Sequence, residues 1–112
     1  MPYVHLNVAR KLTEEQIQKT RETIASFMPI IPGKTRENTM IHIEESCHIF
    51  KGDSDECMFL EARLYKPAPL ENKTEFVQKV TAALCELFDI APERLYINII
   101  EMNEWGSGGR YF

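Results

Sequence analysis

The sequence predicts an α/β (α+β) fold: a tandem β-α-β repeat forming a four-stranded mixed sheet, with two helices on one face. Three observations predict it. Apolar and polar residues alternate in four strand-like stretches, and two other stretches have the apolar spacing of amphipathic helices. The second half of the chain also repeats the pattern of the first at an offset of 56 residues. Because parallel β-α-β connections are right-handed, two such units place both helices on the same face of one sheet.

The first unit begins with a strand at Pro2, where apolar and polar residues alternate over residues 2–8. The Thr-Glu-Glu-Gln sequence at 13–16 is typical of a capping box and predicts a helix to about Met28. Residues 40–44 alternate again and predict the second strand.

The second unit repeats this order. Residues 58–65 predict a strand, and 95–101 predict the fourth strand. Between them, Asn72 with Glu75 is expected to cap a helix that ends at about Phe88.

A chain of 112 residues is predicted to form one domain, 1–112, with pseudo-repeat halves at about 2–56 and 57–112. The net charge of −4 argues against a general nucleic-acid-binding protein, which would present a basic face. We find no signal peptide and no apolar stretch long enough to span a membrane. The three cysteines lack the paired spacing of a disulfide framework, so a cytoplasmic protein with reduced thiols is expected.

The sheet face away from the helices is predicted to be polar and able either to meet water or to line an interior shared by several copies. The segment 105–112 is rich in glycine yet ends in aromatic residues, which predicts that it covers the sheet edge of a neighbouring copy. His5, His42 and His48 form no metal-binding motif, so we expect no metal site and interpret His5 and His42 as packed or interfacial.

Pro2 has a chemical use only if Met1 is removed, because it then carries a free secondary amine. A terminal amine has a reference pKa of about 7.7–8.0, and burial lowers it. Such an amine is a base suited to neutral pH. The alternative is that Pro2 simply begins an edge strand, where no backbone N–H is needed.

Several motifs, in order, resemble the tautomerase superfamily. Pro-Gly-Lys at 32–34 and Arg-Leu-Tyr-Ile-Asn at 94–98 resemble its macrophage migration inhibitory factor branch. The stretch 99–102, followed by Trp-Gly-Ser-Gly-Gly at 105–109, resembles the end of 4-oxalocrotonate tautomerase. The resemblance covers nearly the whole chain.

The resemblance implies a cofactor-independent keto–enol tautomerase acting on a 2-keto acid such as phenylpyruvate. Pro2 would be the general acid and base, and Lys34 would bind the substrate carboxylate. Tyr96 and Asn98 would reach the site from an adjacent subunit of a homotrimer. Tyr65 departs from the macrophage migration inhibitory factor branch, which has a small aliphatic residue there, and would narrow or reshape the pocket. Trp105 would close the pocket or, alternatively, anchor an interface between subunits.

Alternatives remain open for these residues. Lys34 could be a solvated loop lysine, and Tyr96 with Asn98 could be part of a polar sheet face. Glu61 and Arg63 lie two apart on one strand face and could pair structurally, while the position of Arg110 stays open. The alternative functions are a dehalogenase or decarboxylase of the same superfamily, and a non-enzymatic ligand-binding or signalling trimer.

Overall fold

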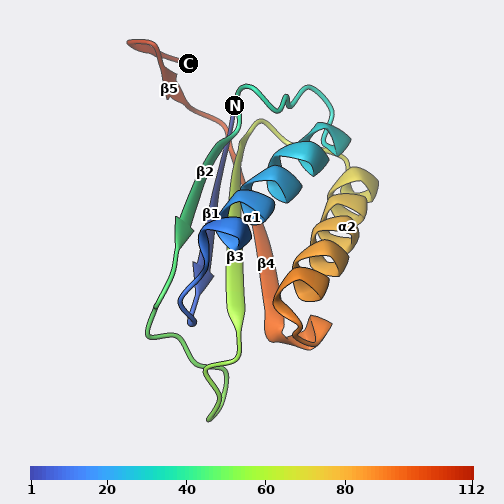
Figure 1. Ribbon diagram of the computed structural model, residues 1–112. Helices are drawn as coiled ribbons and strands as arrows, with labels where there is room; N and C mark the ends of the chain where they lie inside the picture. Colours follow the sequence, from blue (N-terminus) through green and yellow to red (C-terminus); the bar gives the residue numbers. More distant parts are fainter.

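The computed structural model describes residues 1–112 as a four-stranded sheet with strand order β2-β1-β3-β4 and two helices on one face (Figure 1). Two short 3₁₀ turns and a C-terminal two-stranded hairpin complete the chain. The elements are β1 Pro2–Val8, α1 Glu14–Phe27, η1 Met28–Ile30, β2 Met40–Glu44, β3 Met58–Tyr65, α2 Leu70–Phe88, η2 Pro92–Arg94, β4 Leu95–Met102, β5 Gly106–Ser107 and β6 Arg110–Tyr111.

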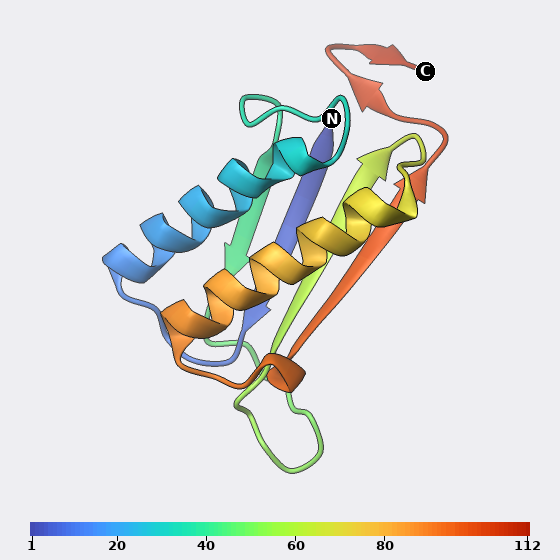
Figure 2. The same ribbon diagram turned by 90° about the vertical axis from the view of Figure 1, so that its right-hand side faces the viewer.

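The sheet is mixed, as predicted. β1 pairs with β2 in parallel and β3 pairs with β4 in parallel, while β1 and β3 run antiparallel at the centre. His5 stands directly opposite Glu61, and these two residues are separated by the repeat offset of 56. A local twofold relation between the two halves therefore passes between these residues. In agreement with it, the two helices run in opposite directions (Figure 2).

The capping box at the start of α1 is confirmed. Thr13 Oγ1 accepts a hydrogen bond from the Gln16 backbone N–H at 3.1 Å, and Gln16 Oε1 accepts one from the Thr13 N–H at 3.0 Å. Two backbone donors at the helix start that lack intrahelical partners are thereby satisfied.

The start of α2 differs from the prediction. The helix begins at Leu70 behind Pro69, which makes no side-chain capping bond. Because proline fixes its own φ near the helical value, the chain turns into the helix directly after the extended Pro69. Asn72 thus lies within the first turn, and its Nδ2 donates to the Ile30 carbonyl at 3.1 Å. It ties α2 to the 3₁₀ turn that follows α1.

The core lies between the sheet and the helices. Alternate residues of β1 and β3 are buried on the helix side, and they form one cluster of 17 residues with the apolar faces of α1 and α2. Leu60, Phe76 and Val80 are among its fully buried members. The opposite side chains of the same strands leave the other sheet face without cover from the helices. We call it the open face.

The C-terminal hairpin extends past the end of the sheet at which the N-terminus lies (Figure 1, Figure 2). Gly108 and Gly109 have φ of 59° and 82°, the left-handed values that a tight two-residue hairpin turn requires. Tyr111 is 73% exposed. Neither helix of the chain has the length and apolar character to span a bilayer.

Candidate active site

We call the end of the sheet at which the N-terminus lies its upper end (Figure 1). The start of β1, an inner strand, lies there. Pro2 is buried and pairs with Leu64 near the end of β3, and Met1 is half-buried beside it. Burial and the neighbouring Lys34 ammonium both lower the pKa of the Met1 amine from its usual value, burial being the larger cause. An amine at this end of the chain is therefore easier to deprotonate than one in water.

Lys34 reaches this end from the loop before β2. Gly33 has φ of 79°, which turns the chain after η1, and the Lys34 N–H bonds to the Ile31 carbonyl at 3.1 Å. Its Nζ donates to the Tyr65 carbonyl at 2.6 Å, and burial lowers the pKa of its ammonium group. The structure thus brings together three of the predicted site residues: Pro2, Lys34 and Tyr65.

Trp105 lies in the same region, together with Phe112, a residue that sequence reasoning did not select. The Tyr65 ring centroid is 6.4 Å from that of Trp105 and 5.2 Å from that of Phe112. Beside them, an open hollow of about 400 Å³ is lined by residues that include Tyr3, Arg63 and Trp105. An aromatic wall therefore borders the upper end of the open face.

Tyr96 and Asn98 lie on β4, away from Pro2. In the β3–β4 pairing, Leu64, the partner of Pro2, stands opposite Glu101, whereas Tyr96 stands opposite Phe59. Tyr96 is five positions from Glu101 along β4, or roughly 17 Å at the usual rise per residue. It is 53% exposed, and the Lys51 ammonium lies 4.7 Å from the centre of its ring. Within one chain, neither Tyr96 nor Asn98 reaches Pro2.

The pairing proposed for Arg63 and Glu61 is present. Two guanidinium nitrogens of Arg63 lie 3.1 and 3.0 Å from Glu61 Oε1 on the open face. Arg110 lies in β6 of the hairpin, with its guanidinium carbon 5.7 Å from the centre of the Phe112 ring.

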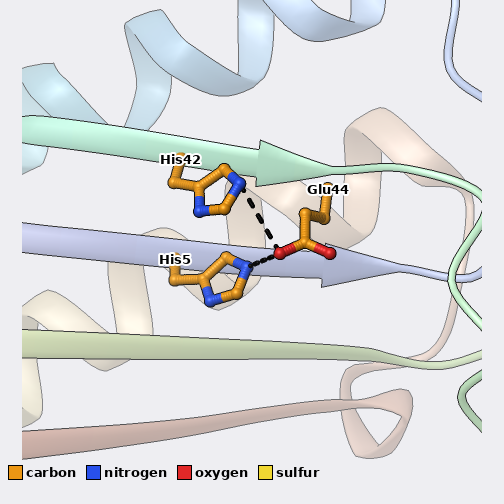
Figure 3. A group of neighbouring side chains, drawn as sticks. All are labelled: His5, His42 and Glu44. Carbon is orange, nitrogen blue, oxygen red and sulfur yellow. Dashed lines mark hydrogen bonds and ion pairs between the residues drawn. The ribbon is translucent and has the colours of Figure 1, made fainter.

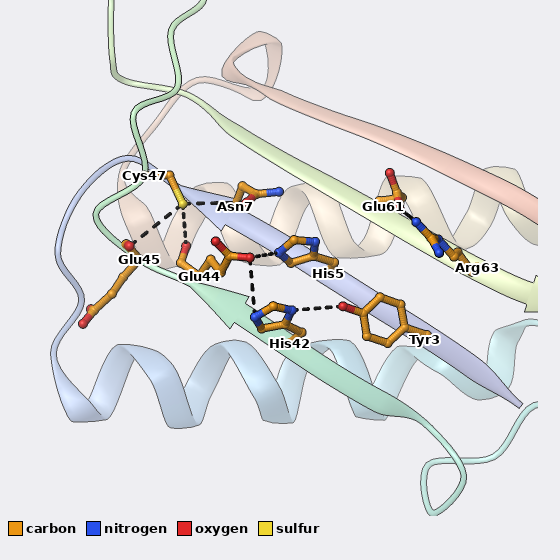
Figure 4. A network of polar contacts seen from close by, with 9 residues as sticks. All are labelled: Tyr3, His5, Asn7, His42, Glu44, Glu45, Cys47, Glu61 and Arg63. Carbon is orange, nitrogen blue, oxygen red and sulfur yellow. Dashed lines mark hydrogen bonds and ion pairs between the residues drawn. The ribbon is translucent and has the colours of Figure 1, made fainter.

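One polar group on the open face was not anticipated. Tyr3, His5, His42 and Glu44 form a connected network across β1 and β2 (Figure 4). His42 and Glu44 lie two apart on one strand, so their shared face is visible in the sequence. That His5 stands directly beside His42 depends on the β1–β2 register, which strand periodicity does not specify.

Similar solved structures share this fold. MIF2 of Leishmania major has a TM-score of 0.90 and 16% identity, covering 100% of this chain and 97% of that one. N1, a member of the cis-3-chloroacrylic acid dehalogenase family, has a TM-score of 0.83 and 11% identity over 96% and 81% of the two chains. A fused 4-OT described as an asymmetric trimer has a TM-score of 0.82 and 14% identity over 96% and 94%. No family model and no curated protein matches the sequence. These similarities confirm the predicted fold class.

Proposed function

We propose that this chain, which has the fold of the tautomerase superfamily, is a cofactor-independent keto–enol tautomerase of a 2-keto acid. One observation carries the proposal: an amine at the start of β1 has its pKa lowered by burial and by Lys34. Removal of Met1 transfers the terminal amine to Pro2, which is buried more deeply than Met1. A neutral amine held there at neutral pH is a suitable general base.

Lys34 supplies the charge that the substrate requires. Its ammonium group donates to the Tyr65 carbonyl and can donate further hydrogen bonds to the carboxylate of a 2-keto acid. With the carboxylate held, the Pro2 nitrogen takes a proton from the carbon next to the keto group. The conjugate acid then returns that proton to the enolate oxygen, so the base is regenerated and no other reactant is consumed.

Tyr96 and Asn98 complete this site only if a second copy of the chain supplies them. We place them in the site of an adjacent subunit of a homotrimer, where Tyr96 donates a hydrogen bond to the developing enolate and Asn98 binds the far end of the substrate. The fused 4-OT with the same fold is described as a trimer, which supports this arrangement. Tyr65 and Trp105 form the aromatic wall of the pocket.

The test combines intact mass with a ketonisation assay of phenylpyruvate enol. We expect the mass to lack one Met residue, and we expect Pro2→Ala to reduce kcat/KM by about 10²–10⁴-fold, the usual contribution of a general base. Pro92→Ala is the matched control, because Pro92 is exposed in η2 at the opposite end of the sheet. Equal rates for Pro2→Ala and wild type, or full activity with Met1 retained, would contradict the proposal.

The same samples separate the alternative functions. The similarity to a member of a chloroacrylic acid dehalogenase family favours testing chloride release from 3-chloroacrylates. Carbon dioxide release from 3-oxo acids tests a decarboxylase. A non-enzymatic binding protein predicts that Met1 is retained and that no substrate is turned over.

A further inference from the structure

The open face carries a group of metal-ligating side chains separate from Pro2. His5 in β1 and His42 in β2 are direct register partners, and their imidazole rings stack with centroids 4.2 Å apart and an interplanar angle of 3°. Glu44 lies two residues beyond His42 on the same face of β2. Both histidines face the Glu44 carboxylate (Figure 3).

The two carboxylate–imidazole distances are close to those around a bound cation, and a rotation of the stacked rings is needed to turn both imidazole lone pairs onto one ion. Glu44 Oε1 lies 2.8 Å from His5 Nε2 and 3.5 Å from His42 Nε2, and the three ligand atoms lie within 4.8 Å of one another. Neighbouring ligand atoms of a tetrahedral zinc ion, each about 2.0–2.1 Å from the metal, are about 3.3 Å apart. The two measured carboxylate–imidazole distances lie on either side of that value.

The hydrogen bonds also favour a cation. The 3.5 Å contact between His42 Nε2 and the carboxylate is longer than a normal hydrogen bond, so this nitrogen has no good protein partner. Its other ring nitrogen, Nδ1, lies 3.0 Å from the Tyr3 hydroxyl. A metal-bound histidine usually donates its second ring N–H to an oxygen acceptor, which fixes the tautomer and the ring orientation. The Tyr3 hydroxyl oxygen is in position to be that acceptor. Tyr3 is thus a positioning residue for His42.

The fold does not impose this group. The positions related to His5, His42 and Glu44 by the repeat offset of 56 are Glu61, Asn98 and Ile100, which do not reproduce the ligand set. The three ligand side chains project from two paired strands, and strands hold such groups more precisely than loops do. Their side chains are 22%, 46% and 47% exposed, so an aqueous ion can reach them and keep water in its remaining positions.

We propose that His5, His42 and Glu44 bind one divalent transition-metal ion per chain, with Zn²⁺ as the best fit. Two neutral imidazoles and one carboxylate are a ligand set that zinc uses in proteins, with at least one position left for water. The site lies on the open face, about three residues along β1 from Pro2, or roughly 10 Å. It is independent of the proposed tautomerase chemistry.

The test is calorimetric titration of the full chain, without a histidine tag and freed of metal by a chelator, with ZnCl₂. We expect saturable binding of one ion per chain, and visible d–d absorption when Co²⁺ replaces Zn²⁺. Loss of a residue that only hydrogen-bonds to a metal ligand typically weakens metal binding by roughly 10–100-fold. Loss of a ligand itself, in His42→Ala or Glu44→Gln, should weaken Zn²⁺ binding by more than this. Tyr3→Phe should weaken it by about tenfold.

His48→Ala is the matched control, because His48 is exposed and lies outside the group. We expect it to bind Zn²⁺ as wild type does. The proposal is overturned if wild type shows no saturable binding, or if His42→Ala and Glu44→Gln bind as tightly as wild type. A Zn²⁺-dependent rise in Tm that is present in wild type and absent in Glu44→Gln would support it independently of calorimetry.

Discussion

Lys34 presents a positive charge at the upper end of the sheet, and the acceptor of its hydrogen bond is a backbone carbonyl rather than a carboxylate. Two other lysines, in contrast, form ion pairs with carboxylates: Lys19 with Glu15 at 2.8 Å, and Lys73 with Glu101 at 3.0 Å. Lys34 therefore retains two further donors for an anionic substrate.

Replacing Lys34 therefore tests substrate binding. A hydrogen bond to a charged group contributes about 1.5–3 kcal/mol, so Lys34→Ala should raise KM for phenylpyruvate about 10–100-fold. Lys19→Ala is the control, since its ion pair with Glu15 is exposed on α1. Steady-state kinetics give KM for each variant. An unchanged KM in Lys34→Ala would remove Lys34 from the proposed site.

A terminal amine and Lys34 that share this end of the sheet predict a bell-shaped pH profile of kcat/KM. On the acid side, activity should rise with pH as the Pro2 amine loses its proton. Burial and Lys34 lower the pKa of the Met1 amine, and Pro2 is buried more deeply, so we expect this rise below the usual amine range. On the alkaline side, activity should fall as Lys34 loses its charge, at a pH below the usual range for lysine because burial lowers its pKa.

Lys34→Arg separates these two limbs. A guanidinium stays charged throughout, so the alkaline fall should move to higher pH while the acid limb is retained. An alkaline limb that does not move in Lys34→Arg would show that another group causes it.

At the scale of single elements, the two helices begin in different ways. α1 has a complete capping box, whereas α2 begins behind Pro69 with no side-chain cap. The first turn of α1 is therefore stabilised by two side-chain caps, those of Thr13 and Gln16.

Thr13→Ala should lower the free energy of unfolding by about 1 kcal/mol, the usual value of an N-cap side chain. Thr74→Ala removes the same atoms from an exposed position inside α2 and should change stability by less than about 0.5 kcal/mol. Urea denaturation followed by far-UV circular dichroism measures both. Equal effects of the two substitutions would argue against the cap.

The sequence predicts the elements of this fold better than it predicts their contacts. β3 has the bounds that alternation indicates, because one face is buried under the helices and the other is open. The capping box also predicts α1, because its bonds are local. The start of α2 is wrong in the prediction because Pro69 outweighs the Asn72 signal.

The candidate site shows the same limit. Pro2, Lys34 and Trp105 were selected by motif and Tyr65 as a departure from one, and the structure places them at one end of the sheet. The pairing of His5 with His42 was missed because it joins residues on different strands. Alternation assigns a side chain to a face, but only the register determines which side chains meet.

At the scale of the whole molecule, the C-terminal hairpin is the part least supported by its own chain. An isolated two-stranded hairpin is marginally stable in water, and the core cluster contains no residue beyond Leu95. Its exposed Tyr111 and Phe112 give it an apolar surface that a second copy can cover.

If the chain forms the proposed trimer, a chain ending at Glu104 should therefore be monomeric and keep its fold. Size-exclusion chromatography with light scattering should give a trimer mass for the full chain and a monomer mass for the shortened one. The far-UV spectrum and a cooperative urea transition should persist in the shortened chain. A shortened chain that remains trimeric would show that the hairpin is not required for assembly.

The positions of Pro2 and Tyr96 at opposite ends of the sheet restrict the symmetry of any such trimer. Rotation about a threefold axis leaves the height of every atom along that axis unchanged. A neighbour's Tyr96 can meet Pro2 only if the two residues have nearly equal heights within one chain. The two residues are roughly 17 Å apart along the strands and roughly 10 Å apart across the sheet, because β3 lies between β1 and β4. Their heights are equal only if these two components offset each other along the axis. In the proposed assembly, the strands are therefore inclined to the threefold axis and do not run parallel to it.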